Sequence, residues 1–248
     1  MGYKNNHIKD RSGIFLSEDH EAKFQLSDIY SARVINIFSD ASMTANVHPN
    51  GVCKFGCYGA IVVFLNEIID KEYRVLSNVT TNQCELLGLK TALSFALKYC
   101  TRYDKINIFC DSLYTVDTMR EYIFSYRFKY SEELGYNCLY NSQNKVIANQ
   151  SAIVECAELL NRVKFMNPNV TIYHTSGHVD ETNYDSIKRA ARKFKQLNNV
   201  YETLDLNIIR YLSRYNNYID GITRSYLYSI DMNLNYQIPI EFIPLHRY

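Results

Sequence analysis

The sequence predicts an α/β fold in which helices flank a mixed five-stranded sheet, with three antiparallel strands first and parallel strands after them. Two observations lead to this prediction. Three β-rich runs follow one another after residue 33 with only short turn-prone segments between them, and strands so close in sequence pair antiparallel. The next two β-rich runs each follow a helical pattern, and a helical crossover permits a parallel, right-handed connection.

The first four elements form three strands and a helix. The strand runs are VINIFSD, GCYGAIVVFLNEI and KEYRVLSNV, each bounded by Asn, Gly or acidic residues. A helix is predicted over CELLGLKTALSFALKYC, because its leucines recur at three- and four-residue steps. Thr80, Thr81 and Asn82 are candidate N-caps for this helix.

The remaining elements alternate helix and strand before the chain turns helical. INIFCD is predicted as the fourth strand, and Ser112 can cap a helix over LYTVDTMREYIF. The stretch from Tyr126 to Asn149 is polar and rich in tyrosine and has no clear period. SAIVECAELLNRVKFM predicts a helix, NVTIYHTSGH predicts the fifth strand, and helices continue toward the end.

Composition limits the classes of function. The chain carries 27 Lys+Arg against 26 Asp+Glu, so any basic surface for a nucleic acid must be local. The seven cysteines are irregularly spaced and lack the two-pair pattern of a structural zinc site, which indicates reduced thiols. The N-terminus MGYKNNHIKDRSG has no apolar core of a signal peptide, and no run reaches the roughly 18 apolar residues of a membrane helix. We therefore expect a cytoplasmic protein without a membrane partner.

Two nearly identical hexapeptides, INIFSD and INIFCD, end at Asp40 and Asp111. Side chains alternate along a strand, so the asparagine, phenylalanine and aspartate of each run share one face. If the two strands are parallel neighbours in register, both carboxylates lie at the carboxyl edge of the sheet, about 4.8 Å apart. Carboxylates so close repel each other unless a proton or a cation lies between them. A divalent metal ion explains the pair, although either aspartate alone could be a helix N-cap or an Asx turn.

A third acid, Glu85, lies in TTNQCELLGL. We expect it in the first turn of its helix, where the helix dipole favours an anion and no further function is needed. The helix lies between the two aspartate strands in sequence, however. If it packs across them, Glu85 reaches the same edge of the sheet.

The ordered set of these motifs resembles the type 1 ribonucleases H. The set consists of a strand ending in Asp, a helix with Glu after Thr-Thr-Asn, a strand ending in Asp-Ser, and a later Ser-Gly-His, and the resemblance covers about Val34 to Tyr228. The resemblance implies hydrolysis of the RNA strand of RNA/DNA hybrids by an endonuclease that leaves 5′-phosphates. It also implies two Mg²⁺ ions, which Mn²⁺ can replace, and a monomer that binds the hybrid.

The resemblance also assigns roles to residues. Metal ligands are expected at Asp40, Glu85, Asp111 and Asp220, and His178 is expected to relay protons from a loop near the metals. Asp220 is preferred as the fourth acid because Asn216 precedes it by four residues, as in the family, and because apolar residues bracket it. Asp185 remains an alternative, because it lies nearer to His178 and also opens an amphipathic helix.

The resulting organisation is an N-terminal extension over 1–31, a catalytic domain over 32–231 and a C-terminal tail over 232–248. Choosing Asp220 makes 181–214 a helical insertion, whose basic residues could follow a nucleic-acid backbone or form a solvated helix face. They are Lys188, Arg189, Arg192, Lys193 and Lys195.

Some features depart from the family or favour another function. Ala41 and Leu113 stand where the family usually has glycine and glutamine, and the tryptophan-rich basic protrusion of some members has no counterpart. His174 and His178 raise a zinc alternative, but no cysteine or third histidine lies at ligand spacing. A DNA nuclease of the same fold, such as a resolvase or exonuclease, and a non-catalytic nucleic-acid-binding module remain the other functional hypotheses.

Overall fold

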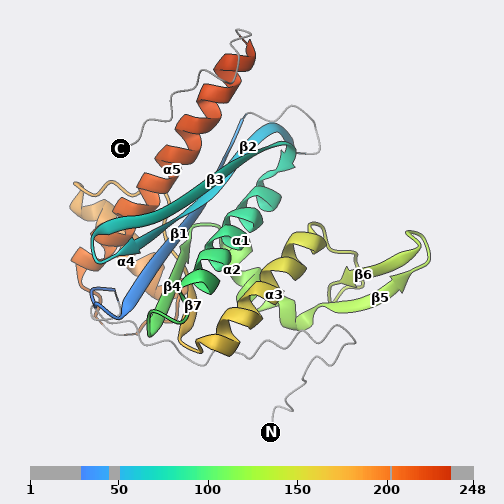
Figure 1. Cartoon of the computed structure of the whole chain (residues 1–248), viewed down its shortest axis with the longest axis horizontal. Helices are drawn as coiled ribbons and strands as arrows, with labels where there is room; N and C mark the ends of the chain where they lie inside the picture. Colours follow the sequence, from blue (N-terminus) through green and yellow to red (C-terminus); the bar gives the residue numbers. More distant parts are fainter. Residues whose placement is uncertain (1–28, 45–50, 202, 236–248) are drawn as a thin grey trace, which may run out of the picture.

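The sheet has the order β3-β2-β1-β4-β7, as Figure 1 shows. The structure is a computed structural model that describes residues 29–44, 51–201 and 203–235. Strands β1 (Val34–Met43), β2 (Val52–Phe64) and β3 (Glu67–Thr80) pair antiparallel. Strand β4 (Lys105–Cys110) pairs parallel with β1, and β7 (Val170–His174) pairs parallel with β4. The predicted fold class is therefore confirmed.

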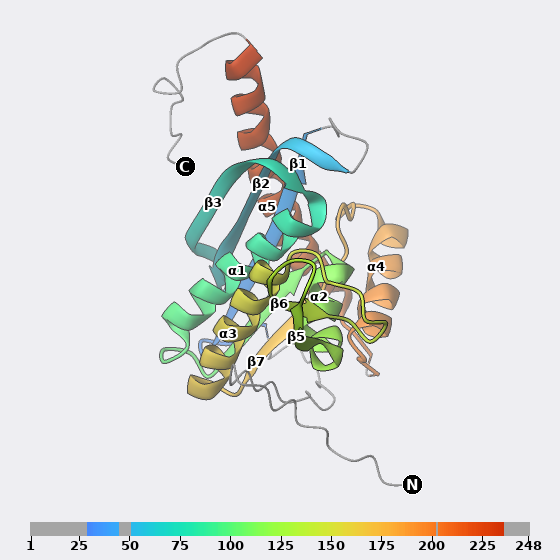
Figure 2. The ribbon, with the colours of Figure 1, turned by 90° about the vertical axis from the view of Figure 1, so that its right-hand side faces the viewer.

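Helices cover both faces of the sheet (Figure 2). On one face α1 (Thr81–Tyr99) and α3 (Gln150–Met166) pack over a core that includes Ile35 and Ile37. On the other face α4 (Tyr184–Leu197) and α5 (Leu206–Asn235) pack over a second core that includes Phe38. The alternation along β1 therefore divides its side chains between the two cores, as the strand period requires.

The turn between β2 and β3 lies earlier than predicted. The sequence pattern extends the second strand through Ile68, but the strand ends at Phe64 and the turn is formed by Leu65 and Asn66. Leu65 takes the left-handed conformation with φ 56°. The hydroxyl of Tyr211 donates to Leu65 O at 3.0 Å, and that of Tyr215 donates to Asn66 O at 2.6 Å. Two tyrosines of α5, distant in sequence, therefore hold this turn.

The first two helices begin at the predicted caps. Thr80 caps α1, its side chain accepting from Gln83 N at 3.3 Å, and Ser112 caps α2 (Leu113–Arg120) by accepting from Thr115 N at 3.3 Å. Because α1 starts at Thr81, Glu85 lies in the second turn, and the prediction of a first-turn position is wrong. Helix α2 is shorter than its pattern predicts, because the chain leaves helical geometry at Glu121 and continues as the 3-10 helix η2 (Tyr122–Ser125).

The tyrosine-rich stretch without a clear period forms a second, two-stranded sheet. Strands β5 (Arg127–Ser131) and β6 (Tyr136–Tyr140) make an antiparallel hairpin whose turn contains Gly135 at φ 74°. Figure 1 shows the hairpin projecting beside α3. Four of the five β5 residues are exposed, so the apolar alternation that identifies a half-buried strand is absent.

The two ends of the predicted domain are partly described. The predicted extension over 1–31 is described only from Ile29, which is buried in the core of α4 and α5. The predicted tail over 232–248 lies outside the described residues beyond residue 235, where α5 ends. The predicted insertion over 181–214 contains α4 and the first turns of α5. Among the described helices, none is long and apolar enough to cross a membrane.

Candidate active site

The two hexapeptides lie side by side in register. Asn36 is opposite Asn107 and Phe38 is opposite Phe109 in the parallel pair of β1 and β4. Asn107 Nδ2 donates to Asn36 Oδ1 at 2.9 Å, and the two phenylalanine rings stack with centroids 4.9 Å apart. Identical residues of the two hexapeptides therefore face each other across the pair, and each contacts its counterpart. The register brings Asp40 and Asp111 to the same edge of the sheet.

Both aspartates hold their protons more tightly than an ordinary carboxyl group does. Asp40 is 4% exposed, and its Oδ1 accepts the Ala41 N–H at 2.7 Å. Burial, followed by the charges of Asp111 and Glu85, raises the pKa of Asp40 well above its ordinary value. Burial also raises the pKa of Asp111, against hydrogen bonds from Asn216 and from the Asp40 carboxyl. Burial and like charge therefore make it costly to ionise both aspartates together in the absence of a cation.

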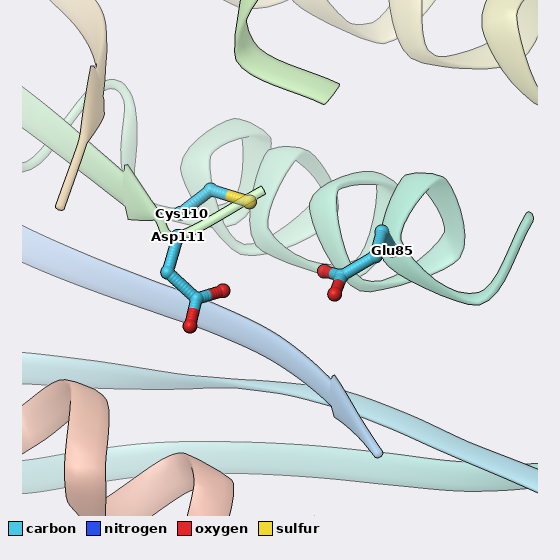
Figure 3. A group of neighbouring side chains, drawn as sticks. All are labelled: Glu85, Cys110 and Asp111. Carbon is cyan, nitrogen blue, oxygen red and sulfur yellow. The ribbon is translucent and has the colours of Figure 1, made fainter. Parts of the chain in front are cut away.

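Helix α1 brings Glu85 to the aspartates. The helix lies close to β1 at Gly88, where a Cβ atom would be 3.2 Å from Asp40 O. Figure 3 shows the Glu85 carboxylate near Cys110 and Asp111, and one ligand atom of each residue lies within 4.8 Å of the other two. Burial and the charge of Asp111 raise the pKa of Glu85 well above its ordinary value. Its Oε2 is buried and has no hydrogen-bond partner among the described residues.

The Ser-Gly-His loop lies against Asp111. A Cβ atom on Gly177 would lie 2.5 Å from Asp111 Oδ2, so only glycine lets the backbone come this close. The next residue, His178, has φ 52° and a side chain that is 70% exposed. Its Nδ1 lies 3.5 Å from Asp220 Oδ2. The loop therefore connects Asp111 to the acid on α5.

Asp220 lies at the rim of the acidic site. Its side chain is 17% exposed, and Arg224 Nη2 contacts both of its oxygens, at 2.8 and 3.0 Å. The charge of Asp220 is one cause of the raised pKa of Asp40. One turn of helix away, the hydroxyls of Thr223 and Ser42 lie 2.9 Å apart and fasten α5 to β1.

Asp185 lies elsewhere. It is exposed in the first turn of α4, where its N–H is accepted by Asn183 Oδ1 at 3.0 Å. No hydrogen bond or ion pair joins it to the other acids within the described part of the chain. The structure therefore brings Asp40, Glu85 and Asp111 together with Asp220 and His178 beside them, and it keeps Asp185 apart.

The zinc alternative receives no support from the position of His174. This residue is buried at the end of β7, and its backbone N–H donates to Asn198 Oδ1 at 2.8 Å. Burial, with the charge of Lys193, lowers the pKa of His174 to about 4. The group of potential metal ligands found in residues 29–44, 51–201 and 203–235 contains neither His174 nor His178.

The donor set fits a divalent cation. Asp40, Glu85 and Asp111 offer hard oxygen atoms, which suit Mg²⁺ or Mn²⁺. Their mutual repulsion and the unpaired Glu85 Oε2 are costs that a cation would remove. Cys110 also lies at this site, although no sequence motif indicates it. Its only signal is the single difference between the two hexapeptides, Ser39 in one and Cys110 at the same register position in the other.

Comparison with known proteins gives one family. The model of the RNase H family matches residues 32–193. That range includes Asp185 and ends before Asp220. No curated protein matches the chain.

Solved structures with a similar fold include viral and archaeal proteins. The foamy viral protease-reverse transcriptase in complex with RNA/DNA hybrid is 16% identical, with a TM-score of 0.45, over 74% of this chain and 21% of that one. The RNase H domain of prototype foamy virus is 19% identical, with a TM-score of 0.44, over 66% of this chain and 92% of that one. RNase H1 from Halobacterium salinarum NRC-1 is 14% identical, with a TM-score of 0.38, over 67% and 95%. The match thus spans about a fifth of the viral polyprotein and nearly all of the isolated domains.

Proposed function

The chain belongs to the RNase H family of nucleases, and on that premise we propose that it hydrolyses the RNA strand of RNA/DNA hybrids by a two-metal-ion mechanism. The observation that supports this proposal most directly is the acidic site at the carboxyl edge of β1 and β4. Glu85 and Asp111 offer ligand atoms within 4.8 Å of each other, and the charges of both raise the pKa of the buried Asp40. Such a site is costly to the fold without a cation.

The metal ligands would be Asp40, Glu85, Asp111 and Asp220. When bound, two Mg²⁺ ions polarise the attacking water and stabilise the leaving 3′ oxygen, so that the products carry 5′-phosphate and 3′-hydroxyl ends. Asp40 and Asp111 are fixed by the register of β1 and β4, and Glu85 by the close packing of α1 at Gly88.

Asp220 and His178 would complete the site from the other side of the sheet edge. Arg224 holds both oxygens of Asp220, which fixes the position of this carboxylate at the rim. His178 lies beside Asp220 on an exposed loop, where an imidazole can accept a proton from water or return one to the leaving group.

Helix α4 offers a surface for the phosphate backbone of the hybrid. Lys188, Arg189, Arg192 and Lys193 are exposed, and no ion pair neutralises them within the described residues. Lys188 and Arg192 are one helical turn apart, about 6 Å along the axis, which is close to the spacing of neighbouring phosphates. The chain as a whole has a net charge of only +1, so this is a local field of the kind that backbone contacts need.

The decisive experiment compares three labelled duplexes of one sequence: an RNA/DNA hybrid, duplex DNA and duplex RNA. We expect cleavage of the RNA strand of the hybrid with Mg²⁺ or Mn²⁺, none with EDTA, and 5′-phosphate ends on the products. Cleavage of duplex DNA in preference to the hybrid would replace this proposal by a resolvase or exonuclease activity. Binding of the hybrid without cleavage in any metal would leave a non-catalytic binding module.

A further inference from the structure

One ligand atom at the acidic site is sulfur. Cys110 Sγ, a carboxylate oxygen of Glu85 and one of Asp111 lie within 4.8 Å of one another. Figure 3 shows the Cys110 thiol pointing toward the helix that carries Glu85. Cys110 is fully buried, whereas Glu85 and Asp111 are half-buried. The thiol therefore lies deeper in the fold than the two carboxylates.

A thiol changes which metals the site prefers. Mg²⁺ binds hard oxygen atoms, whereas thiolate ligands favour Zn²⁺ and other soft cations. Bound zinc lies about 2.3 Å from sulfur and about 2.0 to 2.2 Å from carboxylate oxygen. In a tetrahedral arrangement those ligand atoms would be roughly 3.6 Å apart. Because the observed separations are at most 4.8 Å, the ligand atoms would need to approach each other by roughly 1.2 Å at most.

A second observation also indicates a missing ligand at this place. Glu85 Oε2 is a buried carboxylate oxygen with no hydrogen-bond partner among the described residues. Buried polar atoms are usually paired, since an unpaired one costs free energy. The oxygen belongs to the same three-residue group as the thiol, so one cation could satisfy both.

We propose that Cys110, Glu85 and Asp111 bind a thiophilic divalent cation such as Zn²⁺ or Cd²⁺ in competition with Mg²⁺, and that its binding stops the enzyme. The thiol loses its proton to solvent on binding, as cysteine ligands do. Inhibition follows because Glu85 and Asp111 are then held by an ion bonded to an inner sulfur atom and are no longer free to bind Mg²⁺. The inhibitory part rests on the proposed function, but the binding part does not.

Binding is tested with Cd²⁺ alone on the full, reduced chain, without substrate. A cadmium–thiolate bond has a characteristic ultraviolet charge-transfer absorption, so we expect an absorbance that saturates at one equivalent. Excess Mg²⁺ should suppress it, because the two ions share Glu85 and Asp111. A parent chain with no such absorbance, or with one that Mg²⁺ leaves unchanged, would overturn the proposal whether or not the chain cleaves hybrids.

Variants locate the sulfur. Cys110→Ala should abolish the absorbance, and Glu85→Gln should weaken Cd²⁺ binding by at least about 10-fold, the loss typical even of an outer-shell partner. The matched control is Cys84→Ala. Cys84 is equally buried and precedes Glu85 in the chain, but its Sγ faces β2, where a Cβ on Gly56 would be 2.8 Å away. Loss of the absorbance in Cys84→Ala and its retention in Cys110→Ala would refute the assignment.

Inhibition is measured as the ratio of hybrid cleavage with and without Zn²⁺ at fixed Mg²⁺. Each variant serves as its own reference, so a change in basal rate does not affect the ratio. The Zn²⁺ concentration for half inhibition should rise by at least about 10-fold in Cys110→Ala and stay unchanged in Cys84→Ala. Equal sensitivity of Cys110→Ala and the parent would show that zinc inhibits elsewhere. If Cys110→Ala does not fold by circular dichroism, Cys110→Ser is measured in its place, and the Mg²⁺ competition on the parent still decides the question of binding.

Discussion

Replacing Glu85 by glutamine should stabilise the metal-free protein. The change removes one charge from the acidic site and keeps the size of the side chain. In the parent, Glu85 Oε2 is buried without a hydrogen-bond partner in the described chain, and a carboxylate oxygen of Glu85 lies within 4.8 Å of one of Asp111. The glutamine amide carries no charge and can donate to Asp111, so the variant relieves both the repulsion and the burial of a charge.

The size of the gain follows from this distance. At the upper limit of their separation, 4.8 Å, two unit charges repel by about 3.5 kcal/mol at an effective dielectric constant of about 20. Proton binding by either carboxyl removes part of that repulsion, and burial of a neutral amide costs about 1 kcal/mol. We expect a net increase of about 1 to 2 kcal/mol in the free energy of unfolding. For a chain of this length, that corresponds to a rise of about 2 to 8 °C in Tm.

The gain should depend on pH. Because the pKa of Glu85 is raised in the folded chain, its contribution to stability is fully present below its unfolded pKa of 4.5 and is lost as the pH rises through the folded pKa. The advantage of the glutamine variant should therefore be small near about pH 5 and larger near about pH 8, because it grows as the pH rises toward the folded pKa.

The assay is thermal unfolding followed by circular dichroism in EDTA at both pH values, and then with added Mg²⁺. Mg²⁺ should raise the Tm of the parent more than that of the variant, because the variant has lost a ligand. Asp185→Asn is the matched control, since it removes an exposed acid at a helix start. If Glu85→Gln is no more stable than the parent near pH 8, or is equally favoured at both pH values, the repulsion inferred at this site is absent.

Four further predictions test the assignment of the site. Asp220→Asn should lose most hybrid cleavage at low Mg²⁺ and recover part of it with Mn²⁺, which binds the remaining ligands more tightly. Asp185→Asn should cleave the hybrid at nearly the parent rate. The reverse result would make Asp185 the fourth acid and return 181–214 to the catalytic domain. His178→Ala should slow turnover by about 10²-fold, the usual effect of one acid-base group, with Mg²⁺ still raising Tm as in the parent; an unchanged rate would leave His178 a structural loop residue. Gly177→Ala should displace the Asp111 carboxylate, since the new Cβ would lie 2.5 Å from Asp111 Oδ2, and should weaken Mg²⁺ activation, whereas Gly221→Ala, which meets nothing within 4 Å, should not. Lys188→Gln with Arg192→Gln should raise KM and reduce the salt dependence of hybrid binding by about two in the log–log slope, and a Lys71→Gln control on β3 should leave the slope unchanged.

Much of the fold is determined by local pattern. Alternation along VINIF and INIF assigns the faces of β1 and β4, because the side-chain period of a strand is fixed by covalent geometry. Thr80 and Ser112 begin their helices because their hydroxyls satisfy backbone N–H groups within three residues. The pairing of Asp40 with Asp111 could be predicted for the same reason, since twin motifs on parallel neighbours place like residues opposite each other.

Features that depend on distant contacts could not be predicted in this way. The turn at Leu65 is held by Tyr211 and Tyr215, about 150 residues away. Strand β5 is exposed at four of its five residues and the two buried apolar residues of β6 are consecutive, so neither strand shows a period of two. Nothing in the sequence ranks Asp220 above Asp185 by geometry, because the choice depends on which helix packs on β1, where Thr223 meets Ser42.

The sequence by itself therefore determined the order of the five strands of the main sheet and the helices between them, the shared edge of Asp40 and Asp111, and the family. Tertiary structure alone decided that Cys110 joins Glu85 and Asp111, that Gly177 lies against Asp111, and that Asp220 rather than Asp185 lies beside His178. The physical reason is the distance along the chain over which each interaction acts. Strand period, helix period and caps act between residues a few positions apart, whereas the neighbours of a site are set by the packing of whole helices on the sheet, to which every residue of both surfaces contributes.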